Sequence, residues 1–174
     1  LQVVVQREDG GRGGSRHFCD SVAEGDEIQL AGPKNLFRLD ESARHFVLIA
    51  GGIGITPILA MADRLKALGS SYELHYAGRA RRQMALLDRA VQDHAAGLTL
   101  HIGEEGRRMQ LASMLSSVTA DTRIYACGPD RLIGELESLS GHWPEGVLHF
   151  EHFHTEGAAL DPGKEHAFVV EHLR

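Results

Sequence analysis

The stretch Phe46-Val47-Leu48-Ile49-Ala50-Gly51-Gly52-Ile53-Gly54-Ile55-Thr56-Pro57 decides the fold of this chain. Its first five residues are apolar and predict a strand over 46–50 that is buried on both faces, as parallel sheets require. The glycines predict a sharp turn, and Thr56 as N-cap with Pro57 in the first helical turn predicts a helix over 56–68. In α/β domains a strand, a glycine turn and a helix present backbone amides to a phosphate group, so a nucleotide ligand is the first hypothesis.

The turn departs from the usual dinucleotide-binding fingerprint, G-x-G-x-x-G. Counted from Gly52, the third glycine of that fingerprint falls on Pro57. Glycines also follow strands in turns that bind nothing. On this turn alone, a structural interpretation and a ligand-binding interpretation both remain open.

From Phe46 onward, strand and helix patterns alternate along the chain. Such alternation predicts a doubly wound α/β domain with a parallel five-stranded sheet in the order 3-2-1-4-5. The expected strands cover 46–50, 72–77, 98–102, 123–127 and 147–150, and the expected helices cover 56–68, about 83–95, about 111–116 and 129–139.

Ligands of such sheets bind beyond the carboxyl ends of the first and fourth strands, where the strand order reverses. These ends are the turn 51–57 and the segment Ala126-Cys127-Gly128-Pro129-Asp130. The second segment also follows a strand and uses a proline to open a helix. The sequence therefore predicts that two glycine-bearing turns face one crevice.

Composition excludes several other classes of protein. Hydrophobic residues make up 43% of the 174 residues, and the net charge of −6 leaves no basic excess for a nucleic-acid partner. No apolar run approaches the roughly 18 residues that span a bilayer. Cys19 and Cys127 are the only cysteines, which excludes a disulfide framework and a four-cysteine cluster and favours reduced thiols in the cytoplasm.

The segment before the sheet has a different character. Strands are expected over 2–7 and 27–30 and a short helix over 15–22, which together suggest the second half of a β-barrel. The chain begins inside strand-like sequence, so a fragment is expected. We predict three regions: 1–43 as the barrel half, 44–153 as the nucleotide-binding domain, and 154–174 as a linker with the start of a further domain.

Several motifs together carry a family resemblance. The Gly-Gly-x-Gly-x-Thr-Pro turn and the later Cys-Gly-Pro resemble the ferredoxin–NADP reductase superfamily. The narrower match is to phthalate dioxygenase reductase and its vanillate demethylase reductase relatives, and it rests on the segments 11–15, 32–37, 138–144 and 148–153. The similarity covers nearly the whole chain.

That resemblance implies a flavin-binding barrel, an NAD-binding domain and a plant-type 2Fe-2S domain in series. A hydride would pass from NADH to FMN, and single electrons would then pass through the cluster to a terminal oxygenase component or its ferredoxin. The implied FMN phosphate residues are Gly13, Gly14 and Ser15. The implied nicotinamide nucleotide residues are Gly52, Gly54, Thr56, Pro57, Arg79, Cys127, Gly128 and Pro129, with Cys127, Glu151 and Phe153 beside the reacting rings and Phe150 on the flavin.

Two groups of residues leave alternatives open. Arg79, Arg81 and Arg82 follow the second strand without an acidic residue, which is compatible with a 2′-phosphate, although the resemblance implies NADH. His149, His152 and His154 suggest a metal site, but in an extended segment 149 points away from the other two, so no metal is expected.

The chain also departs from the family pattern. The family's Arg-x-Tyr-Ser flavin motif lies upstream of Leu1, and of the cluster domain only 168–171 is represented, without cysteine ligands. Three hypotheses follow: part of an NADH-dependent flavin reductase, a nucleotide-binding module without turnover, and a histidine-based metal-binding module.

Overall fold

A computed structural model describes residues 2–28 and 35–153. The described residues form two compact units, one ending at Leu36 and the other running over Phe37–Phe153. The second unit holds the sheet. The boundary after residue 43 remains a prediction for the whole protein.

The first unit contains helix α1 (Gly14–Ser21), close to the predicted 15–22. The strand predicted over 2–7 is wrong, since these residues pair with no strand in the described part of the chain. A strand needs a partner for its backbone groups, and 2–28 contains none. The other strand was predicted over 27–30. Residues 27–28 pair with no strand in the described part of the chain, and residues 29–30 lie outside it.

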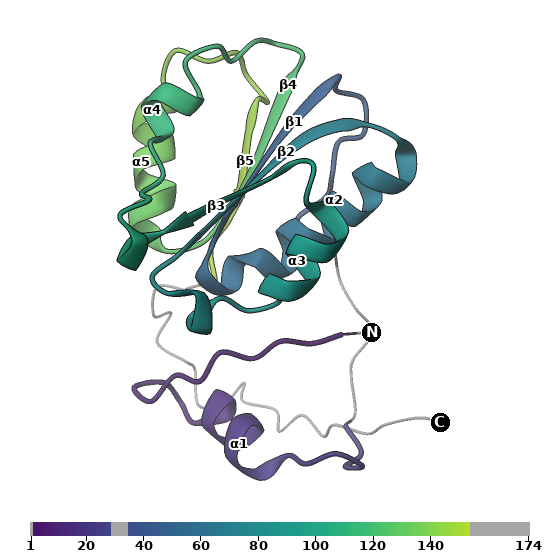
Figure 1. The fold of residues 1–174 in the computed structure, drawn as a ribbon, viewed down its shortest axis with the longest axis vertical. Coiled ribbons are helices and arrows are strands. Elements are labelled where there is room, and N and C mark those ends of the chain that lie inside the picture. Colours follow the sequence, from purple (N-terminus) through teal and green to yellow (C-terminus); the bar gives the residue numbers. More distant parts are fainter. Residues whose placement is uncertain (1, 29–34, 154–174) are drawn as a thin grey trace, which may run out of the picture. The chain divides into compact units, whose positions relative to one another are not determined.

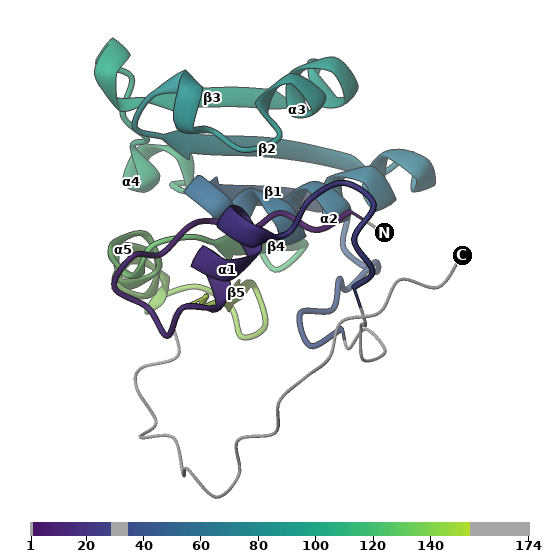
Figure 2. The ribbon, with the colours of Figure 1, turned by 90° about the horizontal axis from the view of Figure 1, so that it is seen from below.

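The second unit is a five-stranded sheet in the order β3-β2-β1-β4-β5, and every pair of neighbours is parallel. This confirms the predicted fold class and strand order. Helices α2 and α3 lie on one face of the sheet and α4 and α5 on the other (Figure 1, Figure 2). The strands are β1 (His45–Gly51), β2 (Ser71–Gly78), β3 (Leu98–Ile102), β4 (Thr122–Cys127) and β5 (Leu148–Glu151). The helices are α2 (Ile55–Leu68), α3 (Leu87–His94), α4 (Leu111–Met114) and α5 (Asp130–Ser140).

Strand β1 separates two apolar clusters. Its even-numbered residues, such as Leu48, pack with α2 in one cluster, and its odd-numbered residues, such as Ile49, pack with α4 and α5 in the other. All residues of β1 after His45 are buried. The continuous apolar run 46–50 therefore reflects a strand covered on both faces.

Helix α2 begins one residue earlier than predicted. A 3-10 turn (Gly52–Gly54) runs directly into it, and the Ile55 N–H bonds to the carbonyls of Gly52 and Ile53. Gly54 is therefore the N-cap, and the prediction of Thr56 as N-cap is wrong. The Thr56 hydroxyl instead donates to the Ile53 carbonyl at 3.1 Å. The helix ends at Gly69, which adopts the left-handed conformation (φ 69°), as predicted.

Helix α3 is shorter than the predicted 83–95. A 3-10 turn (Arg81–Gln83) precedes it, and Leu86 takes a positive φ of 55° before the helix starts. A positive φ is rare for a leucine and interrupts helical hydrogen bonding. Helix α4 is similarly shorter than the predicted 111–116.

A buried polar network joins α2, α3 and β2. His94 is 0% exposed at its side chain, its Nδ1 lies 2.7 Å from the Tyr72 hydroxyl, and its Nε2 lies 3.0 Å from Asp63 Oδ1. Each nitrogen of the ring thus has a partner, as a buried histidine requires.

A second polar contact fixes the start of this unit to β4. The Asp40 N–H donates to the Tyr125 hydroxyl at 2.6 Å, and Arg123 Nε donates to Asp40 Oδ2 at 3.0 Å. Hydrogen bonds from Ser42 and from Arg123 lower the pKa of Asp40 to about 2. The segment that leads into β1 is therefore held on the sheet.

No helix among residues 2–28 and 35–153 is long and apolar enough to cross a membrane.

Candidate nucleotide-binding site

The turns after β1 and β4 touch each other through their backbones. A Cβ added at Gly54 would lie 2.2 Å from the Cys127 carbonyl oxygen and 2.8 Å from the Gly128 nitrogen. A Cβ at Gly128 would lie 3.0 Å from the Gly51 Cα. A side chain at Gly54 would overlap backbone atoms, and one at Gly128 would force Leu132 or the Gly51 backbone to shift, so glycine is favoured at both places. The prediction that the two turns meet is confirmed.

Gly52 has a different reason to be glycine. Its φ is +56°, in the left-handed region, and a Cβ at this position would meet nothing within 4 Å. The turn is therefore open around Gly52. Helix α2 begins shortly after it, with Pro57 in its first turn. The Ile55 N–H is paired with the carbonyls of Gly52 and Ile53, so the helix offers a ligand the positive end of its dipole. The arrangement suits an anionic ligand.

Cys127 ends β4 beneath this turn and is 0% exposed. Burial, with a smaller contribution from the charge of Glu151, raises the pKa of the Cys127 thiol to about 12. Glu151 is its register partner on β5. The thiol is therefore protonated at neutral pH and is no nucleophile, since only the thiolate attacks.

The residues predicted at the end of β5 divide between two faces. Glu151 pairs with Cys127, whereas Phe150 pairs with Ala126 and packs on the cluster that faces α5. Neighbouring residues of a strand point to opposite faces of the sheet, so Phe150 and Glu151 cannot both lie on the same face as Cys127. Phe153 follows the strand and is 44% exposed. The structure thus brings Glu151, but not Phe150, beside Cys127.

The three histidines of this segment do not converge. His149 stacks on Tyr125 with ring centroids 4.8 Å apart and donates to the Gly146 carbonyl at 2.8 Å. His152 lies 3.5 Å from Asp130, and His154 lies outside the described residues. In the part of the chain that the structure describes, no three His, Cys, Asp or Glu side chains are grouped to hold a metal ion.

The arginines after β2 have acidic neighbours that the local sequence does not reveal. Arg81 Nε lies 2.6 Å from Glu105, and Arg82 Nη1 lies 3.1 Å from Glu104. Both carboxylates come from the 3-10 turn that follows β3 (Gly103–Glu105). The sequence shows no acidic residue beside these arginines at the end of β2, but the folded sheet brings two carboxylates to them. Arg79 is exposed, and its carbonyl accepts the Glu104 N–H at 3.0 Å.

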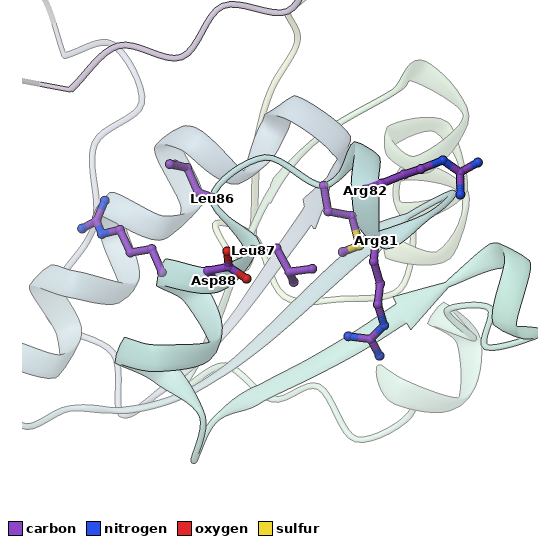
Figure 3. Close-up of a pocket in the computed structure, with 7 residues that line it drawn as sticks. Arg81, Arg82, Leu86, Leu87 and Asp88 are labelled. Atoms are coloured by element: carbon purple, nitrogen blue, oxygen red, sulfur yellow. The ribbon is translucent and has the colours of Figure 1, made fainter.

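An open hollow of about 700 Å³ lies beside these arginines, between the 3-10 turn after β2 and the start of α3 (Figure 3). Sequence reasoning missed its other lining residues, although the apolar run after Arg82 is a visible signal. They are Met84, Leu86, Leu87, Asp88 and Arg89. Met84 packs on the end of β2, where a Cβ at Gly78 would lie 2.4 Å from the Met84 Cγ. The hollow thus combines apolar and cationic groups.

The predicted FMN phosphate residues lie in the first unit. Gly13 has a φ of 96° and caps α1, whose first turn contains no acidic residue. Arg16 Nη2 would lie 3.6 Å from a Cβ at Gly13. The Ser15 hydroxyl accepts the Glu8 N–H at 3.0 Å. These features suit a bound phosphate.

Comparison with known proteins supports the resemblance. No protein-family profile matches the chain. It is 40% identical over 171 residues to the carnitine monooxygenase reductase subunit of Acinetobacter baumannii. The matched region covers 97% of the chain and 52% of that protein. It is 37% identical over 155 residues to phthalate dioxygenase reductase of Burkholderia cepacia, covering 87% of the chain and 48% of that protein.

Solved structures agree with the sequence comparison. Phthalate dioxygenase reductase, described as a modular structure for electron transfer from pyridine nucleotides to [2Fe-2S], superimposes with a TM-score of 0.81 at 37% identity. That match covers 88% of the chain and 49% of the structure. An intact type IV self-sufficient cytochrome P450 monooxygenase gives a TM-score of 0.85 at 46% identity, covering 94% of the chain and 21% of the structure.

The sheet order and the paired glycine turns define a nucleotide-binding domain of the ferredoxin–NADP reductase type. More narrowly, the chain is similar over most of its length to one part of phthalate dioxygenase reductase and of carnitine monooxygenase reductase subunits. It spans about half the length of the curated relatives it matches.

Proposed function

We propose that this chain is part of an NADH-dependent flavin oxidoreductase that supplies electrons to an oxygenase. The observation that carries the proposal is the backbone contact of Gly54 with Cys127, which closes the end of the sheet where such folds bind their ligand. The names of the relatives, reductase subunits of oxygenases, support the direction of electron flow.

The pyrophosphate of NADH is assigned to the turn after β1. Gly52 leaves the backbone open to a ligand, and the start of α2 supplies the positive end of a helix dipole. An anion at such a position gains about 0.3–1 kcal/mol from the dipole. Thr56 and Pro57 belong to the same first turn of α2, so they complete this part of the site.

The nicotinamide is assigned to the turn after β4, with Cys127, Gly128 and Pro129. The protonated, buried thiol keeps water out of this end of the sheet, and Gly128 packs against the Gly51 backbone, so the turn has a fixed shape against which a flat ring can lie. Glu151 adds a carboxylate beside Cys127. Holding the reacting atoms about 3–3.5 Å apart supplies much of the rate of such a transfer. These residues therefore position the nucleotide and take no part in covalent chemistry.

The flavin is assigned as FMN, with its phosphate at Gly13, Gly14 and Ser15. When bound, it accepts a hydride from NADH, which is two electrons, and releases the electrons one at a time. In a longer protein of this kind a 2Fe-2S centre would supply the single-electron route to a terminal oxygenase component or its ferredoxin, and we propose the cytoplasm as its location. Phe150 and Phe153 are proposed to act on the flavin side of this transfer.

The adenosine end of NADH is assigned to the hollow beside Arg81. Its leucine and methionine side chains suit an adenine ring, and Arg79 stands at the end of β2, where the ribose lies in related folds. The apolar and cationic lining together match a base that is joined to a pyrophosphate.

Calorimetric titration with NADH, and the NADH-dependent reduction of an artificial electron acceptor after FMN is added, test the proposal together. Micromolar NADH binding with FMN-dependent turnover supports it. Binding without FMN uptake or turnover would favour a nucleotide-binding module without catalysis. The absence of NADH binding would refute the assignment of the site.

A further inference from the structure

Two acidic residues hold the arginines beside the adenosine hollow. Glu105 makes a two-point contact with Arg81, with Nε–Oε1 and Nη2–Oε2 distances of 2.6 and 3.3 Å. It also accepts a hydrogen bond from Arg107. Glu104 pairs with Arg82 at 3.1 Å. In Figure 3 the Arg81 and Arg82 side chains extend from the turn in different directions, and each has its own carboxylate.

The backbone fixes these carboxylates in place. The turn that carries them follows β3, the direct neighbour of β2, and the Glu104 N–H donates to the Arg79 carbonyl. A Cβ at Gly103 would lie 3.5 Å from that same carbonyl, so the two turns are packed closely. Hydrogen bonds from Arg81 and then from Arg107 lower the pKa of Glu105 to about 2. Both turns therefore present paired charges at neutral pH.

We propose that Glu104 and Glu105 determine specificity for NADH over NADPH, by engaging the arginines that a 2′-phosphate needs and by repelling that phosphate. The inference rests on the proposed function, because it takes the hollow to hold the adenosine end. A 2′-phosphate carries a charge of about −1.5 to −2 and binds best to a free guanidinium. Here it must displace a carboxylate from Arg81 or Arg82 and remain beside it. The 2′-hydroxyl of NADH carries no charge, so it neither has to displace a carboxylate nor is repelled by one.

The experiment measures the affinities of the chain for NADH and NADPH by calorimetry, in the unchanged chain and in the double variant Glu104→Gln, Glu105→Gln. We expect the variant to gain about fivefold or more in affinity for NADPH, because the carboxylates that pair with Arg81, Arg82 and Arg107 are removed, while NADH affinity changes less than about twofold. A third variant that adds Arg81→Ala should lose most of this gain.

The matched control is the double variant Glu135→Gln, Glu137→Gln, which removes the same charge from α5 on the other face of the sheet. It should leave the ratio of the two affinities unchanged. An equal gain in this control, or no gain in the first double variant although NADH still binds, would overturn the inference and leave the proposed function intact. Failure of the unchanged chain to bind either nucleotide would overturn both.

Discussion

Replacing Gly54 by alanine tests the contact that closes the site. The φ of Gly54 is −60°, a value that alanine adopts freely. Without the neighbouring turn, the substitution would stabilise the protein by about 0.4–1 kcal/mol, because alanine restricts the unfolded chain. The added Cβ would instead lie 2.2 Å from the Cys127 carbonyl oxygen and 2.4 Å from its carbon. Sterics and backbone entropy therefore predict opposite signs.

The steric effect should win, because the obstructing atoms belong to the backbone of a buried strand. Overpacking in a well-packed region costs about 1–3 kcal/mol, and backbone atoms yield less than a flexible side chain. After the entropic gain is subtracted, we expect a net loss of about 2 kcal/mol. With the urea dependence usual for small domains, that loss lowers the unfolding midpoint by about 1 M.

The measurement is urea unfolding of the chain and its variant, followed by circular dichroism. Gly134→Ala in α5 is the matched control, because a Cβ there would meet nothing within 4 Å. That control should gain about 0.5–1 kcal/mol. The reasoning would be refuted by a Gly54→Ala variant whose midpoint equals or exceeds that of the unchanged chain. If the site assignment holds, Gly54→Ala also weakens NADH binding, whereas Gly134→Ala does not.

Three further predictions concern single side chains. Tyr72→Phe removes the hydroxyl 2.7 Å from the buried His94 and should cost about 1–3 kcal/mol in urea unfolding; an unchanged midpoint would show that the ring needs no such partner. Brief alkylation at pH 8 should modify Cys19, which is exposed, and spare Cys127, whose pKa is about 12; mass spectrometry of the peptides distinguishes the two sites. Asp40→Asn should destabilise at pH 7 by about 1 kcal/mol or less, since the Asp40 side chain is 41% exposed. Because the folded pKa of Asp40 is about 2, below its ordinary 3.8, the contribution is complete above about pH 4 and lost between pH 4 and 2. A difference between the two proteins that persisted at pH 2 would contradict this cause.

The sequence predicted the sheet well because its signals are local. The run 46–50 and the predicted strand 98–102 correspond to β1 and β3 within one residue at each end. Alternation of strand and helix patterns predicted a doubly wound sheet, and the order 3-2-1-4-5, one of its common forms, placed Gly54 and Cys127 together. The candidate site was thus inferred from the order of elements along the chain.

The errors concern contacts that no local pattern encodes. Thr56 has the chemistry of an N-cap, but the preceding 3-10 turn already satisfies the helix start. The helix predicted over 83–95 was too long, because nothing in the sequence around Leu86 indicates the positive φ that this residue adopts. The carboxylates of Glu104 and Glu105 reach Arg81 and Arg82 across two strands, a proximity that only the folded sheet creates.

The packing of Gly54 on Cys127 has a consequence for the order in which the domain assembles. The two residues belong to the first and fourth strands, so their contact requires β4 to dock beside β1 after most of the chain has been synthesised. Contacts between such distant segments form slowly, since a long loop must close before they contribute. Competence to bind a nucleotide should consequently appear late in refolding, together with the last native structure. A nucleotide that binds only this finished state would raise the melting temperature of the entire sheet.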